Sequence, residues 1–231
     1  ALAKQRSKDT GERFTLEGRL CAELHKIGVQ PHIIQIYDQG EYQEEEEVLY
    51  QELEYCPGKS LADAIKPSQE TEHLIAVEQV VGWVEQAALG LAVLHKYEII
   101  HRDIKPSNLL LGADGLVKVA DLGLAQTKQS RLVRLDLGSL QADHPGTTQY
   151  MPPEQQPGRL MALRPSADVY ALGCVLFELL TGKTYYYQKP GTRLRDLRAD
   201  VPEWLEELVA RMLAKDPEVR PWDGAEAGEG L

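Results

Sequence analysis

The stretch that decides the fold of this chain is His101-Arg102-Asp103-Ile104-Lys105-Pro106-Ser107-Asn108. We expect a loop here, because Pro106 prevents a helix from continuing and Ser107 and Asn108 favour turns. An amphipathic helix pattern precedes the loop, and a short pair of strand patterns follows it. The loop places a carboxylate, an ammonium and an amide oxygen at fixed offsets. Those groups suit the transfer of a phosphoryl group to a hydroxyl, which needs positioning and charge neutralisation.

The composition is that of an acidic chain with one sizeable core. Its 231 residues, 43% of them hydrophobic and 26% charged, fit one large domain or two small lobes. The net charge of −11 argues against nucleic acid or an anionic membrane surface as a partner. Residues 171–180 form the longest apolar run, which is too short to span a bilayer. The three cysteines show no metal-ligand spacing, so we expect reduced thiols in the cytoplasm.

The first 55 residues carry the patterns of a small strand-and-helix lobe. Apolar residues at spacings of four and three predict a helix over residues 13–27. Strand patterns follow at 33–37 and 48–54, and the acidic run between them predicts a solvated hairpin turn. Turn-forming residues occupy 55–58. We therefore place the linker there and divide the chain into lobes of residues 1–55 and 56–231.

Beyond the linker the predicted elements are mainly helices. Apolar spacing predicts helices over residues 77–96, 166–180 and 202–214, with Ser166 as the N-cap of the second. Strand patterns at 109–111 and 117–120 flank a Gly-Ala-Asp-Gly turn and predict a hairpin. The small polar residues 224–231 predict a frayed end. Together the patterns indicate an α+β fold with a small β-rich lobe and a larger helical lobe.

Three motifs in this order resemble the signature set of protein kinases. They are the 101–108 loop, Asp121-Leu122-Gly123 directly after the predicted hairpin, and Met151-Pro152-Pro153-Glu154 before the 166–180 helix. The resemblance runs roughly over residues 33–220 and is to serine/threonine kinases of the bacterial, eukaryotic-like type. It implies the bilobal protein kinase fold, ATP and Mg²⁺ as cofactors, and a protein serine or threonine hydroxyl as the acceptor.

The resemblance implies a role for each polar residue of the loop. Asp103 would orient the acceptor hydroxyl and accept its proton, and Lys105 would meet the transferring phosphate. Asn108 and Asp121 would hold Mg²⁺, since amide and carboxylate oxygens suit this hard cation. Without that neighbourhood each would be an ordinary turn residue. The lysine at position 105 and the 146–150 segment, as a substrate platform, resemble the serine/threonine-specific branch.

The residues that would bind the ATP phosphates lie near the start of the sequence. Lys4 would hold the phosphates and pair with Glu17, which lies on the apolar face of the predicted 13–27 helix. Lys8 is a second candidate, and a surface lysine is the alternative interpretation of Lys4. No Gly-x-Gly-x-x-Gly occurs in the sequence. We therefore expect a kinase domain truncated at its N-terminus.

The adenine site would lie at the junction of the two lobes. Leu53 would close the back of the pocket, Glu54 and Cys56 would offer backbone groups to the adenine edge, and Leu110 would form the apolar floor. Plain core packing would assign the same residues, so this part of the resemblance is the least specific.

Four further residues resemble supports of a kinase active site. Asp168 would tie the loop backbone from below, and Glu154 and Arg220 would form a buried ion pair. Arg102 resembles the arginine of kinases whose long loop is ordered by phosphorylation. Among the hydroxyls of that loop, Ser139 is our first choice as a regulatory site.

Three functions remain open from the sequence. The first is an active serine/threonine protein kinase. The second is a pseudokinase or scaffold that binds nucleotide without turnover, which the missing Gly-rich loop and the setting of Lys4 motivate. The third is a small-molecule kinase, against which Lys105 and the long segment ending at Glu154 argue.

Overall fold

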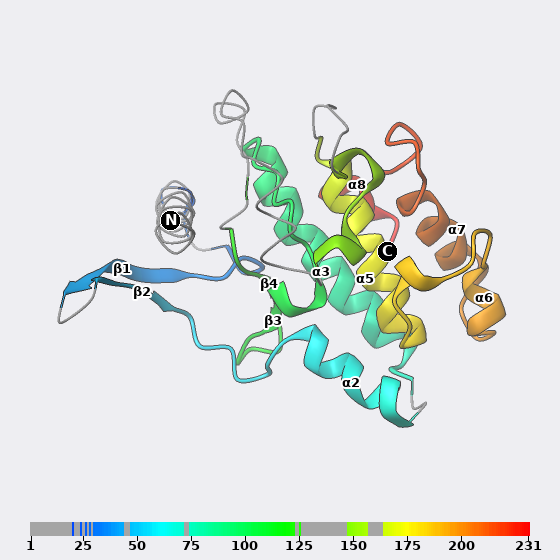
Figure 1. Ribbon diagram of the computed structural model, residues 1–231, viewed down its shortest axis with the longest axis horizontal. Coiled ribbons are helices and arrows are strands. Elements are labelled where there is room, and N and C mark those ends of the chain that lie inside the picture. The colour runs from blue at the N-terminus through cyan, green and yellow to red at the C-terminus, as the bar shows by residue number, and fades with distance from the viewer. Residues whose placement is uncertain are drawn as a thin grey trace, which may run out of the picture.

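The computed structural model of the chain mixes helices and strands (Figure 1). It describes residues 20, 24, 26, 28, 30–43, 47–71, 74–122, 125, 147–156 and 164–231. A two-stranded ribbon extends from one side of a larger body of helices, and a shorter hairpin lies between the two (Figure 1). This arrangement confirms the predicted α+β class. The position of the boundary between the lobes stays a prediction.

The elements follow one another as strand pair, helix pair, short hairpin and helices. They are β1 (Ile36–Gln43), β2 (Glu47–Leu53), α2 (Leu61–Thr71), α3 (Val77–Lys96), η1 (Pro106–Asn108), β3 (Leu109–Leu111), β4 (Val117–Val119), η3 (Thr147–Tyr150), η4 (Pro153–Gln155), α5 (Ser166–Thr181), η5 (Tyr185–Tyr187), α6 (Leu194–Leu197), α7 (Glu203–Met212) and α8 (Gly224–Glu229).

The ribbon β1–β2 is longer than its strand patterns predicted. Its antiparallel register runs from Ile36 opposite Leu53 to Gln43 opposite Glu47, so polar residues that we expected in the turn belong to β1. A two-stranded ribbon tolerates polar side chains along its length, and this masks the alternation that identifies a strand. The start of the predicted 33–37 strand pairs elsewhere: Ile33 bridges Val119 of β4 in parallel orientation.

Helix α3 forms the centre of the core, over the residues that the sequence predicted. Its apolar stripe is fully buried at Val80, Val84 and Leu91, and the helix packs against α5, α8 and β4. Within the described residues it is the one helix long and apolar enough to cross a membrane. Packing at the centre of the helical body accounts for that composition.

Helix α5 confirms the predicted 166–180 helix, but Ser166 is not its N-cap. Ser166 is the first helical residue, and its buried Oγ has no hydrogen-bond partner among the described residues. The carbonyls of Arg164 and Pro165 already accept hydrogen bonds from the amides of Ala167, Asp168 and Val169. Because these carbonyls satisfy the free amides of the first turn, no side-chain cap is needed. The predicted 202–214 helix is confirmed as α7.

Three helices differ from the expectations, and one of them is the short helix α6, which the sequence analysis did not predict. Helix α2 was not predicted, because Pro67 in its interior interrupts the pattern; its start carries a capping box between Ser60 and Asp63. Residues 224–229, expected to fray, form α8 instead. Asp223 caps α8 through the amide of Glu226, and the helix packs against α3.

Candidate active site

The loop between α3 and β3 is held in place by one buried carboxylate. Asp168, at the start of α5, accepts hydrogen bonds from the backbone amides of His101 at 2.7 Å and Arg102 at 2.8 Å. Its Oδ2 also lies 2.9 Å from Nε2 of His95. The role that the resemblance implied for Asp168 is therefore confirmed by its contacts. Arg102 takes a left-handed backbone conformation, with φ of 70°, at the point where the loop turns.

Opposing effects act on the pKa of Asp168. Burial alone would raise it, but the hydrogen bonds from His95 and from the backbone amide of Arg102 outweigh burial. The pKa of Asp168 therefore lies below its ordinary value, and the carboxylate stays ionised. An ionised acceptor makes stronger hydrogen bonds to the loop amides than a neutral one.

Asp103, Lys105 and Asn108 lie together, as their spacing predicted. The Lys105 ammonium is 2.6 Å from Oδ2 of Asp103. The Asn108 amide nitrogen donates to the carbonyl oxygen of Asp103 at 2.9 Å and to its Oδ2 at 3.2 Å. The other carboxylate oxygen, Oδ1, is buried and has no hydrogen-bond partner among the described residues. A buried, unpaired carboxylate oxygen is costly, and an incoming hydroxyl donor would satisfy it.

The chain places Asp121 directly beyond a contact with this loop. Ala120 donates its amide to the carbonyl oxygen of Asn108 at 2.9 Å, and a ring nitrogen of His101 lies 3.0 Å from the carbonyl of Ala120. Asp121 follows in the left-handed region, with φ of 66°, and is exposed. The sequence analysis missed the part of His101 in this link, which a motif cannot reveal because the partner is a backbone carbonyl.

The donor set fits a magnesium ion held on phosphates. Both hydrogen bonds from the Asn108 amide nitrogen point toward Asp103. The side-chain oxygen of Asn108, Oδ1, is therefore the atom that would bind the metal, and it accepts a hydrogen bond from Ser107 at 3.4 Å. The described residues contain no group of three or more His, Cys, Asp or Glu side chains that could hold a metal by themselves. An amide and a carboxylate would share Mg²⁺ with the oxygens of a bound phosphate.

The residues expected around adenine lie in the segment between β2 and α2, at the end of β2 and in the neighbouring strand β3. Leu53 ends β2 and is 43% exposed. Cys56 is partly buried; burial and the nearby charge of Glu54 raise the pKa of its thiol. Leu110 lies in β3, where it bridges Ser60.

Two backbone hydrogen bonds hold this segment against β3. The amide of Gly58 donates to Leu111 at 3.1 Å, and that of Leu111 donates to Lys59 at 2.8 Å. A Cβ at Gly58 would lie 2.4 Å from Cβ of Leu111, so the approach requires glycine.

One residue of this region was missed by the sequence analysis. Lys118, between two valines in β4, is buried and forms an ion pair with Glu54 at 3.0 Å. A lysine inside an apolar strand was the available signal, since a buried ammonium requires partners.

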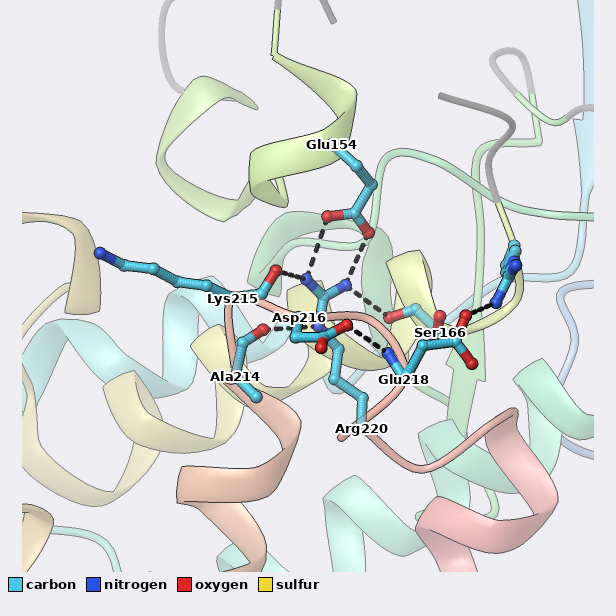
Figure 2. A network of polar contacts seen from close by, with 8 residues as sticks. Glu154, Ser166, Ala214, Lys215, Asp216, Glu218 and Arg220 are labelled. Atoms are coloured by element: carbon cyan, nitrogen blue, oxygen red, sulfur yellow. Dashed lines mark hydrogen bonds and ion pairs between the residues drawn. The ribbon is translucent and has the colours of Figure 1, made fainter. Parts of the chain in front are cut away.

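The expected ion pair between Glu154 and Arg220 is confirmed. Arg220 donates to the Glu154 carboxylate at 2.6 Å and 3.0 Å, and both side chains are buried. Figure 2 shows the guanidinium between Glu154 and the carbonyl groups of Ser166, Ala214 and Lys215.

The segment after Glu154 also contacts the loop at 101–108. The side-chain amide of Gln155 donates to the carbonyl of Arg102 at 3.0 Å. Tyr150 donates to Glu178 at 2.6 Å, and burial together with this hydrogen bond raises the pKa of the Tyr150 hydroxyl. Residues 150–155 are therefore tied both to the loop at 101–108 and to α5.

Several predictions fall outside the described residues. They concern Lys4, Lys8, Glu17 and Ser139. Within the predicted 13–27 helix, Leu20 and Leu24 are helical and buried. The proposed phosphate grip and the regulatory phosphorylation site stay predictions.

Comparison of the sequence with known proteins shows which family the chain resembles. Residues 1–225 match the model of the protein kinase domain. The chain is 33% identical over 230 residues to the serine/threonine-protein kinases drp72 of Corynebacterium efficiens, covering 95% of this chain. It is 33% identical over 220 residues to the serine/threonine-protein kinase PrkC of Bacillus subtilis, covering 89% of this chain. It is also 32% identical over 232 residues to the tyrosine-protein kinase MasK of Myxococcus xanthus, covering 92% of this chain.

The chain corresponds to only part of each of these relatives. It spans 41% of the length of the first, 31% of the second and 34% of the third. The similarity therefore concerns the kinase domain of each relative and not its remaining segments.

Proposed function

The chain belongs to the protein kinase family, and from this premise we propose that it transfers the γ-phosphoryl group of ATP to serine or threonine hydroxyls of a protein substrate. The observation that carries the proposal is the arrangement around Asp103. One of its oxygens pairs with Lys105, and the other is buried and lacks a hydrogen-bond partner among the described residues. That second oxygen is suited to receive a hydroxyl proton.

Each residue of the loop would act through its charge and position. Asp103 Oδ1 takes the proton while the acceptor oxygen bonds to the γ-phosphorus and ADP leaves. The Lys105 ammonium, 2.6 Å from Oδ2, lies where it can offset negative charge on the transferring group. Asn108 and Asp121 would hold Mg²⁺, which when bound neutralises phosphate charge. Asp168 acts indirectly, by holding the loop backbone in this conformation.

The substrate and the compartment are proposals as well. We propose a protein with an accessible serine or threonine as the substrate, with no nucleic acid and no membrane surface as a partner of this segment. The net charge of −11 supports this. The free thiols of Cys56 and Cys174 support a cytoplasmic location.

Replacement of Asp103 tests the proposal. In Asp103→Asn, which keeps the shape of the side chain, we expect transfer of labelled phosphate to a serine- and threonine-containing test protein to fall by about 10²–10⁴-fold. Thermal stabilisation by Mg·ATP should persist, because Asp103 acts on the acceptor. Glu207→Gln, at an exposed carboxylate of α7, is the control and should transfer at the wild-type rate. Equal transfer by wild type and Asp103→Asn would contradict the proposal.

Product analysis separates the remaining alternatives. Phosphoserine and phosphothreonine are expected; phosphotyrosine alone would assign the chain the activity after which its relative MasK is named. Stabilisation by Mg·ATP with no transfer would indicate a pseudokinase or scaffold. Transfer only to free hydroxylated metabolites would indicate a small-molecule kinase.

A further inference from the structure

Lys118 holds together three segments that are far apart in the sequence. Its Nζ lies 3.0 Å from Oε1 of Glu54, 3.0 Å from the carbonyl oxygen of Pro31 and 3.6 Å from Oδ2 of Asp114. Pro31 precedes β1, Glu54 follows β2, and Asp114 lies in the turn between β3 and β4. A lysine ammonium has three N–H donors, and here three acceptors surround it.

The ammonium is buried and nevertheless charged. Only 6% of the Lys118 side chain is exposed. Burial alone would lower the pKa of Lys118, but the hydrogen bond and charge of Glu54, together with the charge of Asp114, raise it above its ordinary value. A charged hydrogen bond at low exposure is stronger than one in water. The contact is therefore well suited to fix the position of Glu54.

Glu54 begins the segment that should contact adenine. Its amide donates to the carbonyl oxygen of Gln35 at 2.8 Å, which ties it to the residue that precedes β1. The far end of the segment is tied to β3 through Gly58 and Lys59, as described above. Lys118 adds a tie at the near end, from the carboxylate of Glu54 to the same β3–β4 hairpin. The segment thus has an anchor on the hairpin at each end.

The hairpin also carries the expected floor of the adenine site. Leu110 is the cross-strand partner of Lys118, and residues directly opposite in an antiparallel pair point to the same face. Figure 1 shows this hairpin between the ribbon and α3. The face that holds Leu110 is therefore the face from which Lys118 reaches Glu54.

We propose that Lys118 is a positioning residue for the nucleotide base: through the carboxylate of Glu54 it sets the backbone groups of Glu54 and Cys56 over Leu110. The proposal rests on the proposed function, because it assumes that this segment binds adenine. Lys118 touches no reacting atom, and it acts on the nucleotide site through Glu54. Its loss should weaken nucleotide binding and leave the chemical step intact.

The test compares nucleotide affinity with turnover. In Lys118→Met, which keeps the length and removes the charge, we expect the Kd for Mg·ADP measured by calorimetry and the KM for ATP to rise about tenfold, the effect of one charge-assisted contact. The kcat should stay within about twofold of wild type. Amide exchange at residues 54–57 should become faster. Lys118→Arg keeps the charge and should recover part of the affinity.

Two further variants show whether Lys118 acts through Glu54. The double variant Lys118→Met with Glu54→Gln should bind Mg·ADP no more weakly than the weaker single variant, because both remove the same contact. Lys189→Met, at an exposed lysine far along the chain, should match wild type.

Other outcomes would overturn the assignment. If Lys118→Met lowers the Tm but leaves Kd and KM unchanged, Lys118 is only a structural brace. If the wild-type chain does not bind Mg·ADP, the proposal is also wrong. If wild type binds Mg·ADP but transfers no phosphate, the proposed kinase function fails, while the Kd comparison still decides the role of Lys118.

Discussion

A single carboxylate, that of Asp168, determines the conformation of the loop on which the proposed chemistry depends. It accepts from two consecutive amides, His101 and Arg102, and an isolated loop would not hold both in this orientation. Arg102 adopts a positive φ of 70°, a conformation that costs a non-glycine residue free energy. The two hydrogen bonds to Asp168 compensate for that cost. The conformation of the loop therefore depends on the ionisation of the Asp168 carboxylate.

Replacing Asp168 by asparagine should therefore destabilise the chain and alter its acid sensitivity. The folded-state pKa of Asp168 lies below the ordinary value of 3.8, so its contribution to stability is present above that pH and is lost as the pH falls through the lower, folded-state pKa. We expect Asp168→Asn to reduce the free energy of unfolding by about 3 kcal/mol at pH 7. Urea titrations at pH 7 and pH 3 should show a smaller difference between the two proteins at pH 3. An equal difference at both pH values would contradict this account.

At the scale of elements, periodicity predicted α3 and α5 because both bury a continuous apolar stripe. It missed α2, where Pro67 interrupts the pattern, and α8, whose small residues carry no stripe. The active-site loop was predictable because Asp103, Lys105 and Asn108 are close in sequence. The partners of Lys118 were not predictable, since Pro31 and Glu54 are distant along the chain. Short-range patterns predict contacts within an element, while contacts between elements depend on the folded structure.

Helix α8 shows why small residues at the end of the described chain form an ordered helix. Gly224 donates its amide to Nδ1 of His95 at 3.0 Å, and Asp223 caps the helix. A Cβ at Gly224 would lie 2.5 Å from the carbonyl oxygen of Ala88 and 2.5 Å from the amide nitrogen of Ala92. Glycine at this position therefore permits α8 to pack directly on the backbone of α3.

A pair of glycine-to-alanine substitutions tests this packing. Gly224→Ala should destabilise the chain by about 2 kcal/mol, because overpacking against a helix backbone cannot relax easily. Gly228→Ala is the matched control: its Cβ would meet Cβ of Ala88 at 3.6 Å, an ordinary contact. It should be neutral or stabilising, since alanine favours helix. Thermal unfolding of both variants is the measurement, and equal Tm values would show that α8 does not pack as described.

At the scale of the whole molecule, Arg220 joins parts of the chain that no single element connects. Besides Glu154 it donates to the carbonyls of Ala214 and Ser166 (Figure 2), and its guanidinium lies 4.9 Å from the ring centre of Tyr170. The Glu154 end lies next to Gln155, which contacts the loop at Arg102. The pair therefore links the segment before α8, through Glu154 and Gln155, to the proposed catalytic loop.

Because the Arg220–Glu154 pair is buried, its loss should cost much more free energy of unfolding than loss of the exposed pair between Arg164 and Glu218. Arg220→Met leaves the Glu154 carboxylate buried without its partner, so we expect a loss of about 3–5 kcal/mol in the free energy of unfolding. The double variant with Glu154→Gln should lose less than the sum of the two single variants, because each breaks the same contact. Arg164→Met is the control, because its arginine pairs with Glu218 and the two side chains are 46% and 65% exposed; it should cost less than about 1 kcal/mol. Additive losses in the double variant would show that Arg220 stabilises the chain through the backbone carbonyls instead of through Glu154.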